Sequence, residues 1–272
     1  MIVSILQPPY PSPGQATAAL SWQTKTLRAI EKKSTDLILL PENSNCTGGL
    51  NFAETLHLLE NEGAQFVVEM RTQAERIGAA IMAGVMTRDA SGTLRNELML
   101  IPPGEPSRYL YSKNHLVRPE LEHGILPGDR ANVFFYNGIC FGAAICFDFY
   151  FPELFCHYAK QRVDVLVIVS HQRQEPSENL VLLSRARAFD CGCTLLRAAP
   201  AMDNSDIGGR SMVIAPDGSV LADAGGTPGV LTCEIDPKAR FIRAASYSEP
   251  NRIGDYREII QNACRPELYW RT

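Results

Sequence analysis

Short apolar runs rich in β-branched residues alternate with longer amphipathic segments along most of this 272-residue chain. The runs have the length and composition of buried strands, and the longer segments carry apolar residues at helical spacing. We therefore expect strands at residues 2–6, 37–40, 80–86, 97–101, 133–135, 139–145, 163–169, 194–198, 211–214 and 229–235, and helices at 15–33, 63–77, 152–161 and 178–191. Apolar strands alternating with helices predict an α/β fold in which helices cover the faces of a sheet.

Turn residues support this organisation. Gly78 and Gly192 stand where helical C-caps are expected, and Pro216-Asp217-Gly218 predicts a tight hairpin turn. Without an internal repeat or a Pro/Ser-rich linker, we expect a single domain over residues 1–272. Residues 113–132 combine prolines, glycines and acidic residues and predict a long loop, and such loops often carry function.

The composition excludes several classes of protein. A hydrophobic content of 45% with 21% charged residues suits a globular chain with its own core, and a net charge of -4 offers no basic surface for nucleic acid or an anionic membrane. No stretch has the 18 or so apolar residues of a membrane span, and the N-terminal run lacks the basic region of a signal peptide. We expect a cytoplasmic protein that binds neither nucleic acid nor membranes.

Sequence motifs for common cofactors and metals are missing. The chain has no GxSxG, HExxH, GxxxxGK[ST] or GxGxxG, and its 5 histidines form no ligand spacing with cysteine. Cys191 and Cys193 are the nearest approach to a metal-binding pair, and no second pair accompanies them. We therefore expect no metal and no cofactor, and we interpret the 8 cysteines as reduced thiols.

Three ionisable residues follow predicted strands. Glu42 comes after the apolar run at 36–41, Lys113 follows another strand-like run, and Cys146 ends the run at 142–146, before a turn into a helix. Taken singly, they are typical of a solvated loop acid, a surface lysine and a small buried thiol. Taken together, they are the base, cation and nucleophile that acyl transfer requires.

The sequence around these residues resembles the carbon-nitrogen hydrolase, or nitrilase, superfamily. The resemblance lies in LLPEN at 39–43, YSKNHL at 111–116, GAAICFDFYFPEL at 142–154, RARAFDCGC at 185–193, GRSMVIAPDGSVLADAG at 209–225 and RPELY at 265–269. It implies a four-layer αββα sandwich and a catalytic triad of Glu42, Lys113 and Cys146. Members of this family usually form homodimers or larger homo-oligomers, so we expect self-association.

The resemblance also implies supporting residues. A second glutamate in the loop after the lysine positions that lysine and the substrate; Glu120 and Glu122 are both candidates. We favour Glu122, because the motif resembles KNHLVPxGE with one residue inserted. The backbone N–H of Phe147, directly after the nucleophile, would complete an oxyanion hole with Lys113.

Departures from the family pattern bear on the substrate. Phe147-Asp148 resembles the Tyr-Asp of amidase-type members more than the Trp-Glu of true nitrilases, which favours an amide over a nitrile. Tyr150 stands where many members carry an arginine that binds a substrate carboxylate. His171 and Arg173 follow the strand at 163–169, where members have pocket-lining residues, and Arg173 is a candidate to replace the missing clamp.

The resulting hypothesis is a thiol-dependent amidohydrolase that cleaves a non-peptide C–N bond in a small linear amide or N-carbamoyl compound. The motifs also resemble the catalytic half of apolipoprotein N-acyltransferase, so acyl transfer to a small amine is an alternative. Nitrile hydrolysis by the same thioester chemistry, or a catalytically silent binding protein of the same fold, are the others. The presence of all three triad residues favours an enzyme.

Overall fold

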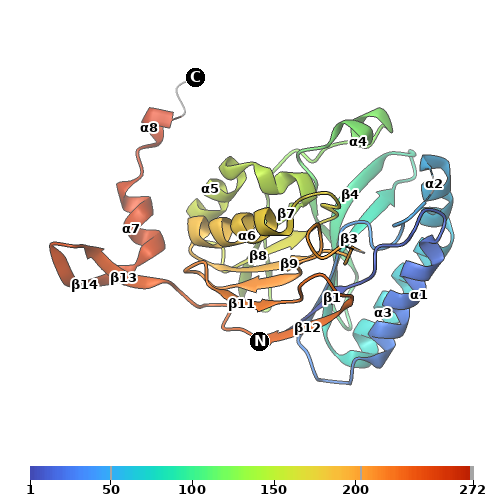
Figure 1. Cartoon of the computed structure of the whole chain (residues 1–272), viewed down its shortest axis with the longest axis horizontal. Coiled ribbons are helices and arrows are strands. Elements are labelled where there is room, and N and C mark those ends of the chain that lie inside the picture. The colour runs from blue at the N-terminus through green and yellow to red at the C-terminus, as the bar shows by residue number, and fades with distance from the viewer. Residues whose placement is uncertain (50, 203, 270–272) are drawn as a thin grey trace.

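Two six-stranded sheets pack face to face, and helices cover the outer face of each (Figure 1). The computed structural model describes residues 1–49, 51–202 and 204–269. Helices α1 (Ala16–Ala29) and α3 (Glu62–Ile77) cover the first sheet, while α5 (Pro152–Lys160) and α6 (Ser177–Cys191) cover the second. This is the four-layer αββα sandwich that the sequence predicts.

The first sheet has the strand order β12-β1-β2-β3-β4-β5. Its strands are β1 (Ile2–Gln7), β2 (Leu37–Leu40), β3 (Ala80–Arg88), β4 (Leu94–Ile101), β5 (Arg108–Ser112) and β12 (Gly229–Glu234). Strands β1, β2 and β3 pair in parallel, and the remaining pairs are antiparallel. Because β4 is antiparallel to both β3 and β5, β5 runs in the same direction as β2. Both strands therefore end at the same edge of the sheet.

The second sheet has the order β11-β10-β9-β8-β7-β6. Its strands are β6 (Val133–Tyr136), β7 (Ile139–Ile145), β8 (Val165–Val169), β9 (Thr194–Ala198), β10 (Met212–Ile214) and β11 (Val220–Asp223). Strands β7, β8 and β9 are parallel, and β10 and β11 form the predicted hairpin at their side. The carboxyl ends of three adjacent strands therefore meet at one edge, where α/β sheets commonly place their ligand chemistry.

Three apolar layers hold the sandwich together. Alternate residues of both sheets, such as Ile5, Leu39, Phe141 and Val167, fill the space between the sheets and are fully buried. The other face of each sheet packs against its helices. Burial on both faces explains why most strands appear in the sequence as continuous apolar runs instead of alternating ones.

Several elements differ from the sequence expectation. Helix α2 (Phe52–Glu60) was not predicted, and the loop at 113–132 contains the short helix α4 (Arg118–Glu122). The C-terminal part adds the hairpin β13 (Ile242–Ser246) and β14 (Glu249–Asp255), then α7 (Tyr256–Ala263) and α8 (Pro266–Tyr269), none of which was expected from the sequence. This arm projects from the sandwich (Figure 1).

The expected helix caps are confirmed. Gly78 and Gly192 follow α3 and α6 in the left-handed conformation, with φ angles of 79° and 57°. None of the described helices is long and apolar enough to cross a membrane.

Candidate active site

The structure brings Glu42, Lys113 and Cys146 together between the two sheets. Glu42 follows β2 and Lys113 follows β5, so both arrive at the same edge of the first sheet. Cys146 follows β7 of the second sheet and is the first residue of the 3-10 helix η1 (Cys146–Tyr150). Glu42 and Lys113 are each 2% exposed, whereas Cys146 is partly exposed.

Lys113 lies between two carboxylates. Its Nζ donates to Glu42 Oε1 at 3.0 Å and to Glu120 Oε1 at 2.9 Å. Asn96, buried in β4, donates its Nδ2 to the same two oxygens at 2.7 and 3.1 Å. This network fixes the ammonium and leaves Oε2 of Glu42, which is buried, without a hydrogen-bond partner among the described residues. That oxygen is therefore available to accept a proton.

The second carboxylate is Glu120, and the preference for Glu122 is not supported. Glu122 is 57% exposed in its side chain and pairs with Arg118 at 2.7 Å, away from the lysine. Glu120 instead turns inward because it is the third residue of α4, where its Oε2 accepts the backbone N–H of Val117 at 2.9 Å. This bond closes the first turn of the helix and leaves Oε1 facing Lys113.

Cys146 occupies a constrained backbone conformation. Its φ angle is 49°, a left-handed value that is uncommon for a residue with a side chain and is often found at functional sites. Asp148 holds the turn: its Oδ2 accepts the Ile145 backbone N–H at 3.0 Å and the Tyr111 hydroxyl at 2.7 Å. Its Oδ1 accepts the backbone N–H of His115 at 2.8 Å, so Asp148 joins the cysteine turn to the segment carrying Lys113.

The electrostatics of the site separate its three roles. Burial alone would raise the pKa of Glu42, but Lys113, His171 and the bonded Asn96 lower it, so Glu42 is ionised at neutral pH. Burial opposes the charge on Lys113, yet Glu42 and Glu120 raise its pKa and keep it cationic. Burial and the charge of Glu42 raise the pKa of the Cys146 thiol, so the resting sulfur is protonated and needs a base.

A glycine allows the base to reach its position. Gly84 lies in β3 beside the end of β2, and a Cβ atom there would stand 2.5 Å from Glu42 Cα and 2.8 Å from the Pro41 carbonyl oxygen. The adjacent backbone bond from Ser44 N–H to Gly84 O is 2.8 Å long. Only a residue without a side chain fits between these strands at this point.

The residues predicted to bind substrate lie around this centre. Phe147 is the second residue of η1, and the backbone N–H of His171 lowers the pKa of the Cys146 thiol. The His171 Nε2 lies 3.2 Å from Thr47 Oγ1, and burial lowers the pKa of His171 to about 4, so the ring is neutral at physiological pH. Tyr150 lies at the rim and donates its hydroxyl to Glu175 Oε2 at 2.5 Å.

Arg173 lies further out than the other predicted residues. It is exposed, and its Nη1 donates to the Tyr10 hydroxyl at 2.7 Å. The guanidinium also stacks over the Tyr10 ring at 5.3 Å from the centroid. Both contacts hold Arg173 at the entrance. Among the described residues, no hydrogen bond links Arg173 to the Cys146 sulfur.

Sequence reasoning missed Asn96 and identified Asp148 only as a sign of the substrate class, although both residues organise the site. Asn96 and Asp148 are 1% and 0% exposed, and each makes three or more hydrogen bonds to catalytic segments or to neighbouring backbone. Asp148 is a single polar residue between two phenylalanines, whereas Asn96 stands between Arg95 and Glu97, and buried polar residues usually have partners. That signal was present in the sequence, because an asparagine is unfavourable in the middle of a strand such as β4.

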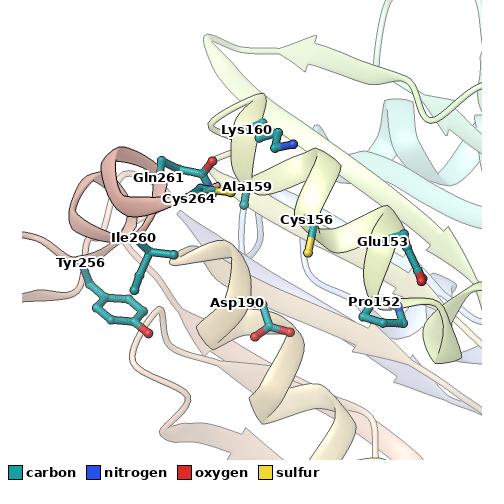
Figure 2. Close-up of a pocket in the computed structure, with 10 residues that line it drawn as sticks. All are labelled: Pro152, Glu153, Cys156, Ala159, Lys160, Asp190, Tyr256, Ile260, Gln261 and Cys264. Carbon is teal, nitrogen blue, oxygen red and sulfur yellow. The ribbon is translucent and has the colours of Figure 1, made fainter. Parts of the chain in front are cut away.

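A separate cavity lies away from these residues. It has a volume of about 540 Å³ and lies among α5, α6 and α7, lined by Pro152, Glu153, Cys156, Ala159, Lys160, Asp190, Tyr256, Ile260, Gln261 and Cys264 (Figure 2). Glu153, Lys160 and Asp190 line it together with Cys156 (Figure 2), but no hydrogen bond between described residues joins them to that thiol. Among the described residues, no group of three or more His, Cys, Asp and Glu side chains is arranged to hold a metal ion.

Comparison with known proteins agrees with this geometry. A family model described as carbon-nitrogen hydrolase matches residues 2–244. The chain is 29% identical over 244 residues to the deaminated glutathione amidase of Synechocystis sp., covering 82% of this chain and 88% of that protein. It is 27% identical over 225 residues to the omega-amidase NIT2 of Xenopus tropicalis, covering 78% and 80%.

Solved structures share the fold. An amidase from Nesterenkonia sp. superposes with a TM-score of 0.74 at 20% identity, covering 99% of this chain and 95% of that one. The protein XC1258 from Xanthomonas campestris, described as a CN-hydrolase superfamily protein, has a TM-score of 0.72 at 23% identity, covering 87% and 90%.

Proposed function

The chain belongs to the carbon-nitrogen hydrolase family, whose members act on C–N bonds other than peptide bonds, and we propose that it hydrolyses a small linear amide or N-carbamoyl compound through a thioester on Cys146. In this proposal Glu42 is the general base and acid, Cys146 the nucleophile and Lys113 the cation of the oxyanion hole. One observation carries it: the free buried oxygen of Glu42 and the ammonium of Lys113 both face a thiol on a strained turn.

The first half-reaction forms the acyl-enzyme. Glu42 Oε2 takes the proton of the Cys146 thiol while the sulfur attacks the substrate carbonyl carbon, forming the C–S bond. Because the thiol pKa is raised, the sulfur depends on this base to become a nucleophile. The negative oxygen is stabilised by Lys113 and the Phe147 backbone N–H. The C–N bond then breaks, and Glu42 returns the proton to the leaving amine or ammonia.

The second half-reaction releases the acid. Glu42, again a carboxylate, takes a proton from a water molecule whose oxygen attacks the thioester carbon. Collapse of the tetrahedral intermediate breaks the C–S bond, and the proton on Glu42 returns to sulfur. Lys113 keeps its proton throughout, because its raised pKa makes it a fixed charge and not a base. Glu120 and Asn96 hold that charge in place.

Two features support an amide as the substrate. Several relatives carry the names of amidases, including the 2-oxoglutaramate amidase of Bacillus subtilis at 27% identity over 209 residues. The residue after Phe147 is the buried Asp148, the amidase-type choice, and it joins the cysteine turn to the lysine segment. Interception of the thioester by an amine is the second candidate, and hydroxamate formation with added hydroxylamine measures it.

Substitution of the nucleophile tests this proposal. We expect Cys146→Ala to abolish hydrolysis of a panel of small amides while its melting temperature stays near that of the wild type. Cys156→Ala is the matched control, because Cys156 is a free, exposed thiol on α5 outside the site. Full turnover by a folded Cys146→Ala protein, or equal loss in both variants, would refute the assignment.

We also propose that the protein is cytoplasmic and self-associates. All 8 cysteines are free, which suits a reducing compartment. The projecting arm exposes Ile242, Tyr247 and Ile253, and such apolar surface favours burial against another copy (Figure 1). Sedimentation velocity of the wild type and an Ile253→Asp variant tests the second point; a wild type that is monomeric at every concentration would refute it.

A further inference from the structure

Arg197 is a fully buried cation that has only uncharged partners. It lies in β9 with 0% exposure. Its Nη1 donates to the carbonyl oxygens of Gly209 and Arg210 at 2.5 and 2.7 Å, and its Nη2 donates to Gln172 Oε1 at 3.0 Å. Among the described residues, no carboxylate lies within ion-pair distance of the Arg197 guanidinium. Asp223 pairs with Arg210 instead. A buried charge without a counter-ion is costly, so its retention needs an explanation.

Arg197 lies in the second sheet, two strands away from β7, which Cys146 follows, whereas Lys113 follows a strand of the first sheet. Strands β7, β8 and β9 are adjacent and parallel, and Cys146, the segment after β8 and Arg197 lie at their carboxyl ends. Gln172, which binds the guanidinium, directly follows His171, whose backbone N–H lowers the pKa of the Cys146 thiol. One hydrogen bond therefore joins the guanidinium to the residue next to His171.

Arg197 and a thiolate at Cys146 stabilise each other. Burial lowers the pKa of Arg197 to about 10, while negative charge on Cys146, Tyr150 and Asp223 raises it. The guanidinium is therefore still charged at neutral pH. The effect is reciprocal. A Cys146 thiolate that raises the pKa of Arg197 is itself stabilised by the charge of the guanidinium.

The charges around the sulfur show what this cation adds. From the first sheet, Glu42 and Lys113 face Cys146, and Lys113 is shared between Glu42 and Glu120, leaving that side with two negative charges and one positive. From the second sheet come the neutral His171 ring, the Tyr150 phenol and Arg197. Arg173, on the same side, is exposed, so Arg197 is a buried cation near the sulfur that no carboxylate of the described residues neutralises.

We propose that Arg197 is a positioning residue that supplies the counter-charge for the Cys146 thiolate formed during catalysis. The inference rests on the proposed function, in which Cys146 is the nucleophile. Proton transfer from the thiol to Glu42 moves negative charge from the Lys113 side of the site toward Arg197. A fixed cation there favours this transfer without touching the substrate.

Alkylation of Cys146 by iodoacetamide tests the proposal without any substrate. The rate at Cys146 is followed from pH 6 to 10 by peptide mapping, with the exposed Cys156 in the same molecule as the internal control. We expect Arg197→Gln, which retains donors but not the charge, to raise the apparent thiol pKa by about one unit and slow alkylation at pH 7 about tenfold. Arg197→Lys restores much of the rate, and Cys156 is unchanged in both.

An unchanged alkylation profile in a folded Arg197→Gln protein overturns the proposal. If Arg197→Gln does not fold, the alkylation profile of Arg197→Lys tests the proposal instead. Burial lowers the pKa of an ammonium into the range of the titration, so loss of its proton must slow alkylation below the wild-type rate at high pH. A Lys variant that matches the wild type at every pH also overturns the proposal. Failure of the proposed function is separate, because it would appear as amide turnover by Cys146→Ala.

Discussion

Replacement of Glu120 by glutamine tests which glutamate of the α4 segment supports the lysine. In the structure Glu120 accepts hydrogen bonds from Lys113 Nζ at 2.9 Å and from Asn96 Nδ2 at 3.1 Å. Glu120→Gln keeps the size of the side chain but removes one of the two carboxylates that hold the ammonium. A hydrogen bond to a charged group contributes about 1.5–3 kcal/mol, and in the proposed mechanism this lysine acts in the transition state. The expected loss in kcat/KM is therefore about 10- to 150-fold.

Glu122→Gln is the matched control for this measurement. Glu122 is two residues further along the same helix, and its partner Arg118 is 88% exposed in its side chain. Exposed ion pairs contribute little, so we expect kcat/KM within about twofold of the wild type. Steady-state kinetics on one amide, with circular dichroism to confirm folding, compares the two variants. Equal losses in both, or normal activity in folded Glu120→Gln, would refute the assignment of Glu120.

Three further predictions concern stability and the position of the base. Asp164→Asn should lower the free energy of unfolding by about 2 kcal/mol in urea titrations, because Asp164 accepts from Lys238, from Arg240 at 2.8 Å and from the Cys140 N–H at 2.9 Å. Gly84→Ala should displace Glu42 and reduce kcat/KM more than tenfold; an unchanged value would contradict the close strand approach. His171 remains neutral when folded until its pKa of about 4, whereas the unfolded residue binds a proton below about 6.5. Stability should therefore fall by about 3 kcal/mol as pH drops between these values, and His171→Gln should reduce that slope.

The α/β character of the fold was predictable because it depends on local pattern: buried strands of both sheets are continuous apolar runs. The four-layer sandwich and the candidate triad of Glu42, Lys113 and Cys146 were expected from the family resemblance. Local pattern alone places Glu42 and Cys146 after strands of two different sheets and does not bring them together.

The remaining parts of the site depend on contacts that no local pattern specifies. The choice between Glu120 and Glu122 follows from where α4 begins, since the third residue of the helix turns inward and the fifth outward. Arg197 appears in the sequence as one charged residue in a short apolar strand. Its burial follows from the chain at Gly209 and Arg210, whose carbonyl oxygens it binds.

The C-terminal arm shows a different limit. Strands β13 and β14 are largely exposed, so the apolar patterning that marks a buried strand is absent from them. Asp164 attaches the start of this arm to the second sheet through Lys238 and Arg240, contacts between residues more than 70 positions apart. Pairings over such sequence distances are set by the folded topology and not by local propensity.

Capture of the acyl-enzyme tests the central claim most directly. The protein is incubated with a panel of small linear amides and N-carbamoyl compounds, quenched in acid during turnover and examined by intact-mass and peptide mass spectrometry. We predict a mass increase equal to the acyl group on the peptide that contains Cys146, removed by hydroxylamine and absent from Cys146→Ala. Turnover of a compound without any adduct on Cys146, or with the acyl group on another residue, would contradict the thioester mechanism.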